Sequence, residues 1–387
     1  MSDNTKTSLD TMFKYKVAKK VNRLVPENNK IQQIMGDVEA AMREGRKFLW
    51  PVALTDEHGI TYGDGTVFTY NDAIAAVYDE IELVSNPIVL RSRISLSAAN
   101  RMAHDEDTFI TKMSFRSGVM KKSLVKRLEI ETILGRSTIG LGVITGTPSN
   151  PSGTIFTATI TDATWAPGIW SGLENAVLDV YQTGGTIRKA DVVVTSVDHA
   201  NKTVSFDDGT LAAATDVLYF KGAKSNCFYG LIAQLENAGT LFGISAATYS
   251  LWAGNTYAVG GAIAMDKILT GMSAAVGKGG LDEDSILVIP SKRFEKLNND
   301  LAALVRLGQE KKAQIGHNYI TYTAQFGDLT ICPHSCMPEG YAVAFPESML
   351  KKVGATDVNS ASVPASISSD WKVQPVISSL PRPIGLR

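Results

Sequence analysis

Apolar side chains recur at helical spacing along residues 105–135, the longest such pattern in the chain. The apolar positions fall at steps of four or seven and therefore share one helical face: Phe109, Met113, Met120, Leu124 and Leu128. Acidic residues at the start complement the positive end of the helix dipole, and Gly135 suits the end of the helix. At about 1.5 Å per residue the helix would run roughly 40–45 Å. That length predicts either a long core helix or a strut between separate parts of an extended molecule.

The pattern upstream of this helix changes from helical to strand-like. Residues 29–46 carry a second set of apolar positions at helical spacing, and residues 49–54 read as an apolar strand. Residues 55–79 are rich in turn signals, and residues 88–96 alternate between apolar and polar side chains. A two-stranded excursion is marginal alone in water. We therefore expect this region to lie on another surface, which need not belong to the same chain.

Beyond residue 135 the sequence becomes typical of an all-β region, and it then turns into a mixture of helices and strands. Four segments between residues 145 and 230 read as strands: 155–160, 192–197, 203–206 and 217–220. Further along, residues 262–276 predict a helix and residues 285–289 a buried strand. A helix capped by Ser291 follows, with strands at 329–332 and 341–345. The pattern predicts an α+β protein with an inserted β-rich subdomain.

Charge is balanced over the whole chain but not along it. The formal net charge of −1 predicts no global attraction to nucleic acid or to an anionic membrane. The first 30 residues are polar and basic, and they predict an arm without a core of its own: Lys14, Lys16, Lys19, Lys20, Arg23 and Lys30. Such an arm is a solvated tail, lies on a neighbouring subunit or faces a polyanion.

Cysteine usage and hydropathy indicate the compartment. Three cysteines, an odd number, argue against a disulfide framework and fit a reducing environment. The first residues lack the apolar core of a signal peptide, and no run approaches the roughly 18 apolar residues of a membrane span. The sequence predicts a soluble protein made in a cytoplasm.

The densest cluster of reactive side chains is Cys332, His334 and Cys336. Three soft ligands within five residues could begin a zinc site, with Cys227 or a distant histidine as the fourth ligand, but the spacing matches no common zinc pattern. Glycine-rich segments fail the phosphate-loop and dinucleotide spacings, and the five histidines are scattered. We predict no catalytic residue, no metal ligand and no cofactor. A small zinc or thiol hydrolase using the cluster is the alternative from a different class.

Several stretches resemble the major capsid protein of tailed bacteriophages, whose fold is named after phage Hong Kong ninety-seven. FLWPVALTDEHGITYGDGT (48–66) and NPIVLRSRISLSAANR (86–101) are similar to its extended loop. Residues 105–135 resemble its spine helix. GLIAQLENAGTLFGI and YSLWAGNTYAVGG resemble the approach to the axial domain, and SILVIPSKRFEKL and GDLTICPHSCMPEGYAVAFPESML resemble elements within it. The likeness spans nearly the whole chain, and the β-rich insertion departs from the minimal family pattern.

The resemblance implies an α+β fold of the Hong Kong ninety-seven type, with an N-terminal arm, an extended β-hairpin loop, a spine helix, and peripheral and axial domains. Residues 1–48 would form the arm and a helix, 49–97 the extended loop, 98–145 the spine helix and peripheral domain, 146–230 the inserted β-rich subdomain, 231–346 the axial domain, and 347–387 a C-terminal return to the peripheral and axial domains.

The same resemblance implies a structural protein of the virion and not an enzyme. Hexamers and pentamers would form an icosahedral head around double-stranded DNA, assembled in the bacterial cytoplasm, with portal, scaffolding and decoration proteins as partners and no contact with a membrane. The shell of an encapsulin-type bacterial compartment has the same fold and is the nearest alternative. Some family members join subunits by an isopeptide bond from a lysine of the extended loop. Residues 48–111 contain no lysine, so this loop could not supply one.

Overall fold

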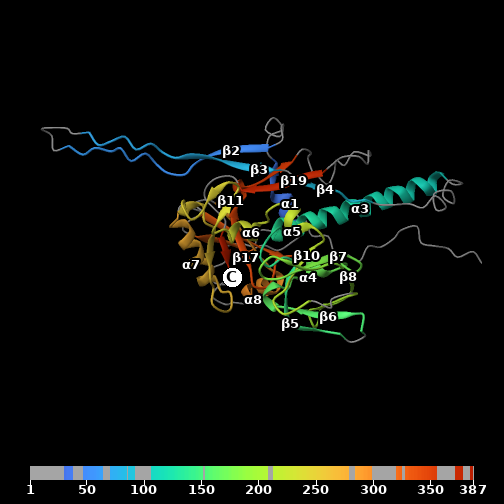
Figure 1. The fold of residues 1–387 in the computed structure, drawn as a ribbon. Helices are drawn as coiled ribbons and strands as arrows, with labels where there is room; N and C mark the ends of the chain where they lie inside the picture. The colour runs from blue at the N-terminus through green and yellow to red at the C-terminus, as the bar shows by residue number, and fades with distance from the viewer. Residues whose placement is uncertain are drawn as a thin grey trace, which may run out of the picture.

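Figure 1 shows a body from which a long hairpin and a long helix project to opposite sides. The computed structural model describes residues 30–37, 47–63, 70–84, 86–91, 106–150, 153–207, 212–278, 284–298, 320–324, 327–354, 371–377 and 384–386. The hairpin consists of β2 (Lys47–Ala53) and β3 (Tyr78–Val84), and the helix is α3 (Glu106–Leu134). Of the basic arm predicted over residues 1–30, only Lys30 is described, as the first residue of α1 (Lys30–Ile34); residues 1–29 lie outside the described residues.

The bounds predicted for the long helix are confirmed, but its C-terminal part is not amphipathic as predicted. From Lys126 to Leu134 the helix is buried all round, with only Arg127 partly accessible, so its end is enclosed by the body. The helix stops at Gly135, where an added Cβ would lie 2.4 Å from the carbonyl oxygen of Phe228. The backbone nitrogen of Gly230 donates to the carbonyl oxygen of Gly135 (2.7 Å), so two glycines allow close backbone contact here.

The helix predicted over residues 29–46 is interrupted soon after its start, and residues 38–46 lie outside the described residues. Helix α1 covers Lys30–Ile34 alone, and Gly36–Asp37 form the short strand β1. The reason is a tertiary pairing that helical spacing cannot reveal: β1 lies parallel to β18 (Leu350–Gly354), with Gly36 opposite Lys351. These strands join β19 (Trp371–Ile377) and β4 (Pro87–Ile88) in a four-stranded sheet of order β1-β18-β19-β4. Strand β4 ends at Ile88, so the strand predicted from the alternating pattern does not continue through residue 91, and residues 92–96 of that pattern lie outside the described residues.

The β-rich region is a closed barrel of order β10-β5-β6-β9-β8-β7. Its strands are β5 (Gly142–Ser149), β6 (Phe156–Ile160), β7 (Val177–Tyr181), β8 (Ile187–Asp198), β9 (Thr203–Phe206) and β10 (Val217–Phe220). Between β6 and β7 lie the 3-10 turn η2 (Asp162–Thr164) and α4 (Pro167–Trp170). Closure leaves no free sheet edge, and the interior is filled by side chains such as Trp170, Phe206 and Ile160.

A six-stranded mixed sheet forms the other half of the body, in the order β13-β20-β17-β14-β16-β15. Its strands are β13 (Asn255–Tyr257), β14 (Ser285–Pro290), β15 (Ile320–Ala324), β16 (Gly327–His334), β17 (Ala342–Pro346) and β20 (Ile384–Leu386). Helices α7 (Met265–Val276) and α8 (Ser291–Asn298) pack side chains on one face. Part of the other face joins the large core shared by the barrel, α1 and the end of α3. The strands predicted at 285–289, 329–332 and 341–345 are confirmed.

Short elements connect these parts: α5 (Ala223–Asn226), α6 (Leu231–Leu235), β11 (Thr240–Leu241), β12 (Ile244–Ser245), and the 3-10 turns η3 (Ser250–Trp252) and η4 (Glu347–Met349). Among the described residues, no helix combines the length and the apolar character that crossing a membrane requires.

Candidate functional site

The projecting hairpin is held at its base by a small apolar cluster. Strands β2 and β3 pair from Lys47 opposite Val84 to Ala53 opposite Tyr78. The buried members of the cluster come from both strands and from β12: Val52, Ile81, Leu83 and Ile244. The backbone nitrogen of Glu82 also donates to the carbonyl oxygen of Phe242 (3.2 Å). The hairpin is therefore fixed to the body at one end only.

Beyond the base the two segments remain hydrogen-bonded to each other. The nitrogen of Leu54 donates to the carbonyl oxygen of Val77 (2.8 Å), and that of His58 donates to the carbonyl oxygen of Ile74 (3.1 Å). Farther out, the side-chain amide of Asn71 donates to the carbonyl oxygen of Ile60 (2.8 Å). These contacts hold an extended ribbon that leaves the body, as Figure 1 shows for the blue segments.

The outer half of the ribbon exposes large apolar side chains. Ile60 is 61% exposed, Tyr62 is 89% exposed and Ile74 is 55% exposed. Single exposed apolar residues are ordinary, but several on one projection without a core behind them mark an interaction surface. We call residues 55–63 and 70–77 the hairpin tip. The tip has the properties expected of a segment that packs on another molecule.

A second feature secures the root of α3. The carboxylate of Glu129 is fully buried and accepts hydrogen bonds from the backbone nitrogens of Ile31 (2.8 Å) and Gln32 (3.0 Å). These are amides of the first turn of α1, which have no partner within that helix. Nε2 of His334, at the end of β16, lies 2.9 Å from Oε1 of the same carboxylate. Glu129 thus joins α1, α3 and the six-stranded sheet.

The hydrogen bonds fix the tautomer of this histidine. The backbone nitrogen of Cys336 donates to Nδ1 of His334 (3.1 Å), so Nδ1 is an acceptor. The ring hydrogen is therefore on Nε2, which donates to Glu129. Both ring nitrogens are occupied, and neither is available to bind a metal or activate a thiol.

The environment of the neighbouring thiols also argues against the hydrolase alternative. Burial raises the pKa of Cys336 to about 12 and also raises the pKa of Cys332. A protonated thiol is a poor nucleophile and a poor metal ligand. Among the described residues, no three side chains of the metal-binding types converge on a common point. Cys332, His334 and Cys336 are therefore part of the protein core.

A third buried group includes Arg127 and Glu131, which flank Glu129 on α3. Burial raises the pKa of Glu131, while the charge of Arg127 and a hydrogen bond with Cys227 lower it. The guanidinium of Arg127 lies over the ring of Phe220 in β10, 2.9 Å from its centroid, and burial lowers the pKa of Arg127 to about 10. This group attaches the long helix to the barrel.

The barrel is joined to the sheet by backbone contacts. Gly168 donates to the carbonyl oxygen of Ser335 (3.0 Å), and Gly340 donates to that of Ala163 (2.8 Å). The carboxylate of Glu339 lies beside them and forms an ion pair with Lys202 of the barrel (3.4 Å). Backbone hydrogen bonds and an ion pair therefore fix the barrel directly to the sheet.

One protein family matches most of the body of this chain. The family is described as SU10 major capsid protein, and the match covers residues 136–358. The chain belongs to the SU10 major capsid protein family. No curated protein sequence matches it significantly.

The fold agrees with this family. The chain is similar to the structure titled "Cyanophage A-1(L) capsid asymmetric unit", with a TM-score of 0.57 and 8% identity over 99% of each chain. Other similar structures are the capsid of a native GTA particle (TM-score 0.48, 10% identity, 100% of this chain and 99% of that chain) and the capsid of cyanophage P-SCSP1u (0.44, 12%, 100% and 96%). The predicted Hong Kong ninety-seven-like fold is confirmed, and this member of the family is a structural component of a phage capsid.

Family membership also bears on the β-rich insertion. The matched region begins at Arg136 and includes the whole barrel, so the barrel belongs to the pattern of this capsid family. The hairpin and the whole of α3, which ends at Leu134, precede the match. The sequence identified the hairpin and α3 by their patterns, but it gave no sign of the contact between Glu129 and His334, which are 205 residues apart.

Proposed function

We propose that this capsid protein forms hexamers and pentamers that close into an icosahedral shell around the double-stranded DNA of a tailed phage, and that the hairpin tip packs on an adjacent subunit. The observation that carries the proposal is the exposure of Ile60, Tyr62 and Ile74 on a ribbon fixed only at its base. Burying one isoleucine side chain against a neighbour contributes about 1.5–3 kcal/mol. Repeated around a ring, such contacts support the heterologous, closing interfaces that a shell needs.

The rigidity of the body supports the same proposal. The hairpin base, the root of α3 and the barrel are each held by buried contacts, so a tip bound to a neighbour would fix the orientation between subunits. Portal, scaffolding and decoration proteins are the further partners we propose, and the host cytoplasm is the proposed place of assembly. Contact between DNA and the basic arm remains a prediction, because the arm lies outside the described residues.

Electron microscopy of the purified chain tests the proposal. The wild-type protein is expected to form shells, hexamers or tubes. The triple variant Ile60→Ser, Tyr62→Ser, Ile74→Ser should remain folded by circular dichroism and elute as a small species. A matched control is Ile187→Ser on the barrel, where the isoleucine is 46% exposed, and this variant should assemble normally. Normal particles from the triple variant would overturn the role of the hairpin tip.

A further inference from the structure

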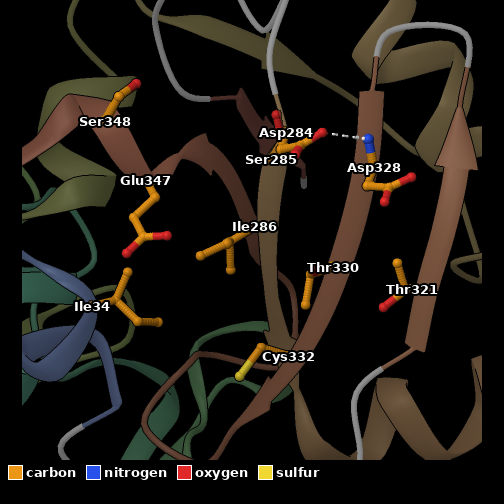
Figure 2. A pocket seen from close by; sticks show the side chains of 10 residues that line it. All are labelled: Ile34, Asp284, Ser285, Ile286, Thr321, Asp328, Thr330, Cys332, Glu347 and Ser348. Carbon is orange, nitrogen blue, oxygen red and sulfur yellow. Dashed lines mark hydrogen bonds between the residues drawn. The ribbon is translucent and has the colours of Figure 1, made fainter. Parts of the chain in front are cut away.

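The face of the six-stranded sheet opposite α7 carries an open hollow of about 540 Å³. Its floor is a row of side chains across three strands, because Ile286 pairs with Thr330 and Thr330 pairs with Thr321. Figure 2 shows Ile34 at the end of α1 and Glu347 of η4 on one side of this floor. We call this hollow the sheet groove. Its volume lies in the range of pockets that accept several side chains.

The charge of the sheet groove has one sign. Its lining includes the carboxylates of Asp284, Asp328 and Glu347, and no lysine, arginine or histidine is among the described residues that line it. Asp284 accepts a hydrogen bond from the backbone nitrogen of Asp328 (2.9 Å), which Figure 2 marks. Within the described part of the chain, neither Asp284 nor Glu347 has a cationic partner. The groove therefore favours a cationic occupant and repels a polyanion.

A buried hydroxyl in the groove provides an independent indication of an occupant. Thr321 is 8% exposed, and its Oγ1 has no hydrogen-bond partner among the described residues. Figure 2 shows Thr321 and Thr330 facing the same hollow. Buried polar groups in native proteins nearly always have a partner. An occupant that brings a hydrogen-bond donor, such as a peptide N–H or an ammonium group, would satisfy this hydroxyl.

The chain itself contains a segment of the required chemistry close to the groove. Residues 14–23 carry four lysines and one arginine, and six residues separate them from α1. At α1 the chain already touches the groove region: Ile34 lines it, and Nζ of Lys30 donates to the carbonyl oxygen of Pro333 (2.5 Å), next to the groove residue Cys332. The seven residue steps from Arg23 to Lys30 span up to about 23–25 Å when extended. A tether this short gives a high effective concentration at the groove.

We propose that the sheet groove binds the basic stretch at residues 14–23 of the same chain. Lysine and arginine side chains pair with Asp284 and Glu347, and a donor from the bound segment reaches Oγ1 of Thr321. Both partners lie in one chain, so the inference does not depend on shell assembly. In the unassembled chain it places the basic stretch on a protein surface.

Limited proteolysis of the full-length, unassembled chain tests the proposal. Chymotrypsin cleaves after Phe13 and Tyr15, which flank or lie within the basic stretch and are unchanged in every variant. A single exposed ion pair is weak, so both carboxylates are changed together. The double variant Asp284→Lys, Glu347→Lys should be cleaved about tenfold faster than the wild type at low ionic strength. The charge-matched control Asp56→Lys, Glu57→Lys on the exposed hairpin should be cleaved at the wild-type rate. High salt should bring the wild-type rate close to that of the groove variant.

Two further variants keep the test decisive if the groove variant fails to fold. Thr321→Val conserves the side-chain volume and should speed cleavage if the hydroxyl holds the bound segment. Reversal of the five cations in residues 14–23 should also speed cleavage, and combining it with Asp284→Lys, Glu347→Lys should restore protection. Equal rates in all variants would overturn the proposal. Protection that increases with protein concentration would assign the groove to a second copy, and protection that appears only on adding DNA would assign the arm to a polyanion; either result would overturn it.

Discussion

Nε2 of His334 donates a hydrogen bond to Oε1 of Glu129 across 2.9 Å, and both side chains are completely buried. The same carboxylate accepts two backbone amides of α1. Three elements that are far apart in sequence therefore meet at one acceptor. A buried carboxylate is costly unless each of its hydrogen bonds is made, so the free energy of unfolding should depend strongly on this group.

The substitution Glu129→Gln tests that dependence. Glutamine keeps one acceptor oxygen and replaces the other with an NH2 group, which must then face a donor from α1 or from His334. We expect the free energy of unfolding to fall by about 2–4 kcal/mol, measured by urea denaturation of the unassembled chain. The matched control is Glu174→Gln, at an exposed position, which should change it by less than about 0.5 kcal/mol. Equal stability of the two variants would contradict the role assigned to Glu129.

The pH dependence of stability should carry a component from Glu131. Burial raises its pKa in the folded chain, so the folded state retains a proton that the unfolded state has lost. The free energy of unfolding from this group is therefore greatest below the unfolded pKa of about 4.3 and declines as the pH rises through the folded pKa. Glu131→Gln cannot lose a proton, so this variant should lose less stability than the wild type between about pH 4.5 and pH 7. Parallel stability curves for the two proteins would show that Glu131 does not contribute.

The joint between the barrel and the sheet should be sensitive to a single methyl group. A Cβ at residue 340 would lie 2.8 Å from Cβ of Ala163 and 2.9 Å from its carbonyl oxygen. Gly340→Ala must therefore shift one backbone segment, and we expect a loss of about 1–3 kcal/mol in the free energy of unfolding. Gly118 lies within α3 with nothing within 4 Å of an added Cβ, so Gly118→Ala should instead stabilise the chain by about 0.5–1 kcal/mol. A change of the same sign in both variants would refute this account of the joint.

Local sequence patterns predicted those parts of the fold whose structure is determined locally. Helix α3 is found within one residue of its expected bounds, and β14 begins at the expected Ser285. The apolar spacing that suggested a continuous helix from residue 29 failed at Gly36 and Asp37, because these two residues pair with β18, more than 300 residues away. Barrel closure was not predictable for the same reason, since β10 closes the ring by pairing with β5 and β7.

The functional features likewise divide into those that local sequence patterns predict and those that depend on contacts between distant residues. The hairpin tip was predictable because its apolar and turn residues lack a nearby core in the sequence itself. The role of His334 was not, because the cysteines beside it suggested metal chemistry and its true partner lies on α3. The sheet groove was equally hidden: its carboxylates come from η4 and from the starts of two strands that only the folded sheet brings together.

Covalent joining of subunits provides the last prediction. Isopeptide cross-linking in similar capsids needs an uncharged lysine amine on the extended loop, favoured by an apolar surrounding that lowers its pKa. Residues 48–111 contain no lysine, and the guanidinium groups of Arg91, Arg93 and Arg101 stay protonated. Lys47 is the nearest lysine, but it lies at the base of the hairpin, opposite Val84, and not at the tip.

The hairpin tip therefore has no lysine amine to offer a neighbour, and we expect its contribution to shell stability to be non-covalent. Mature particles boiled in detergent with reductant should release single chains near 41.6 kDa on a denaturing gel. A ladder of higher bands from wild-type particles would show that a lysine outside the loop has taken over the reaction, and mass spectrometry of the ladder would identify it.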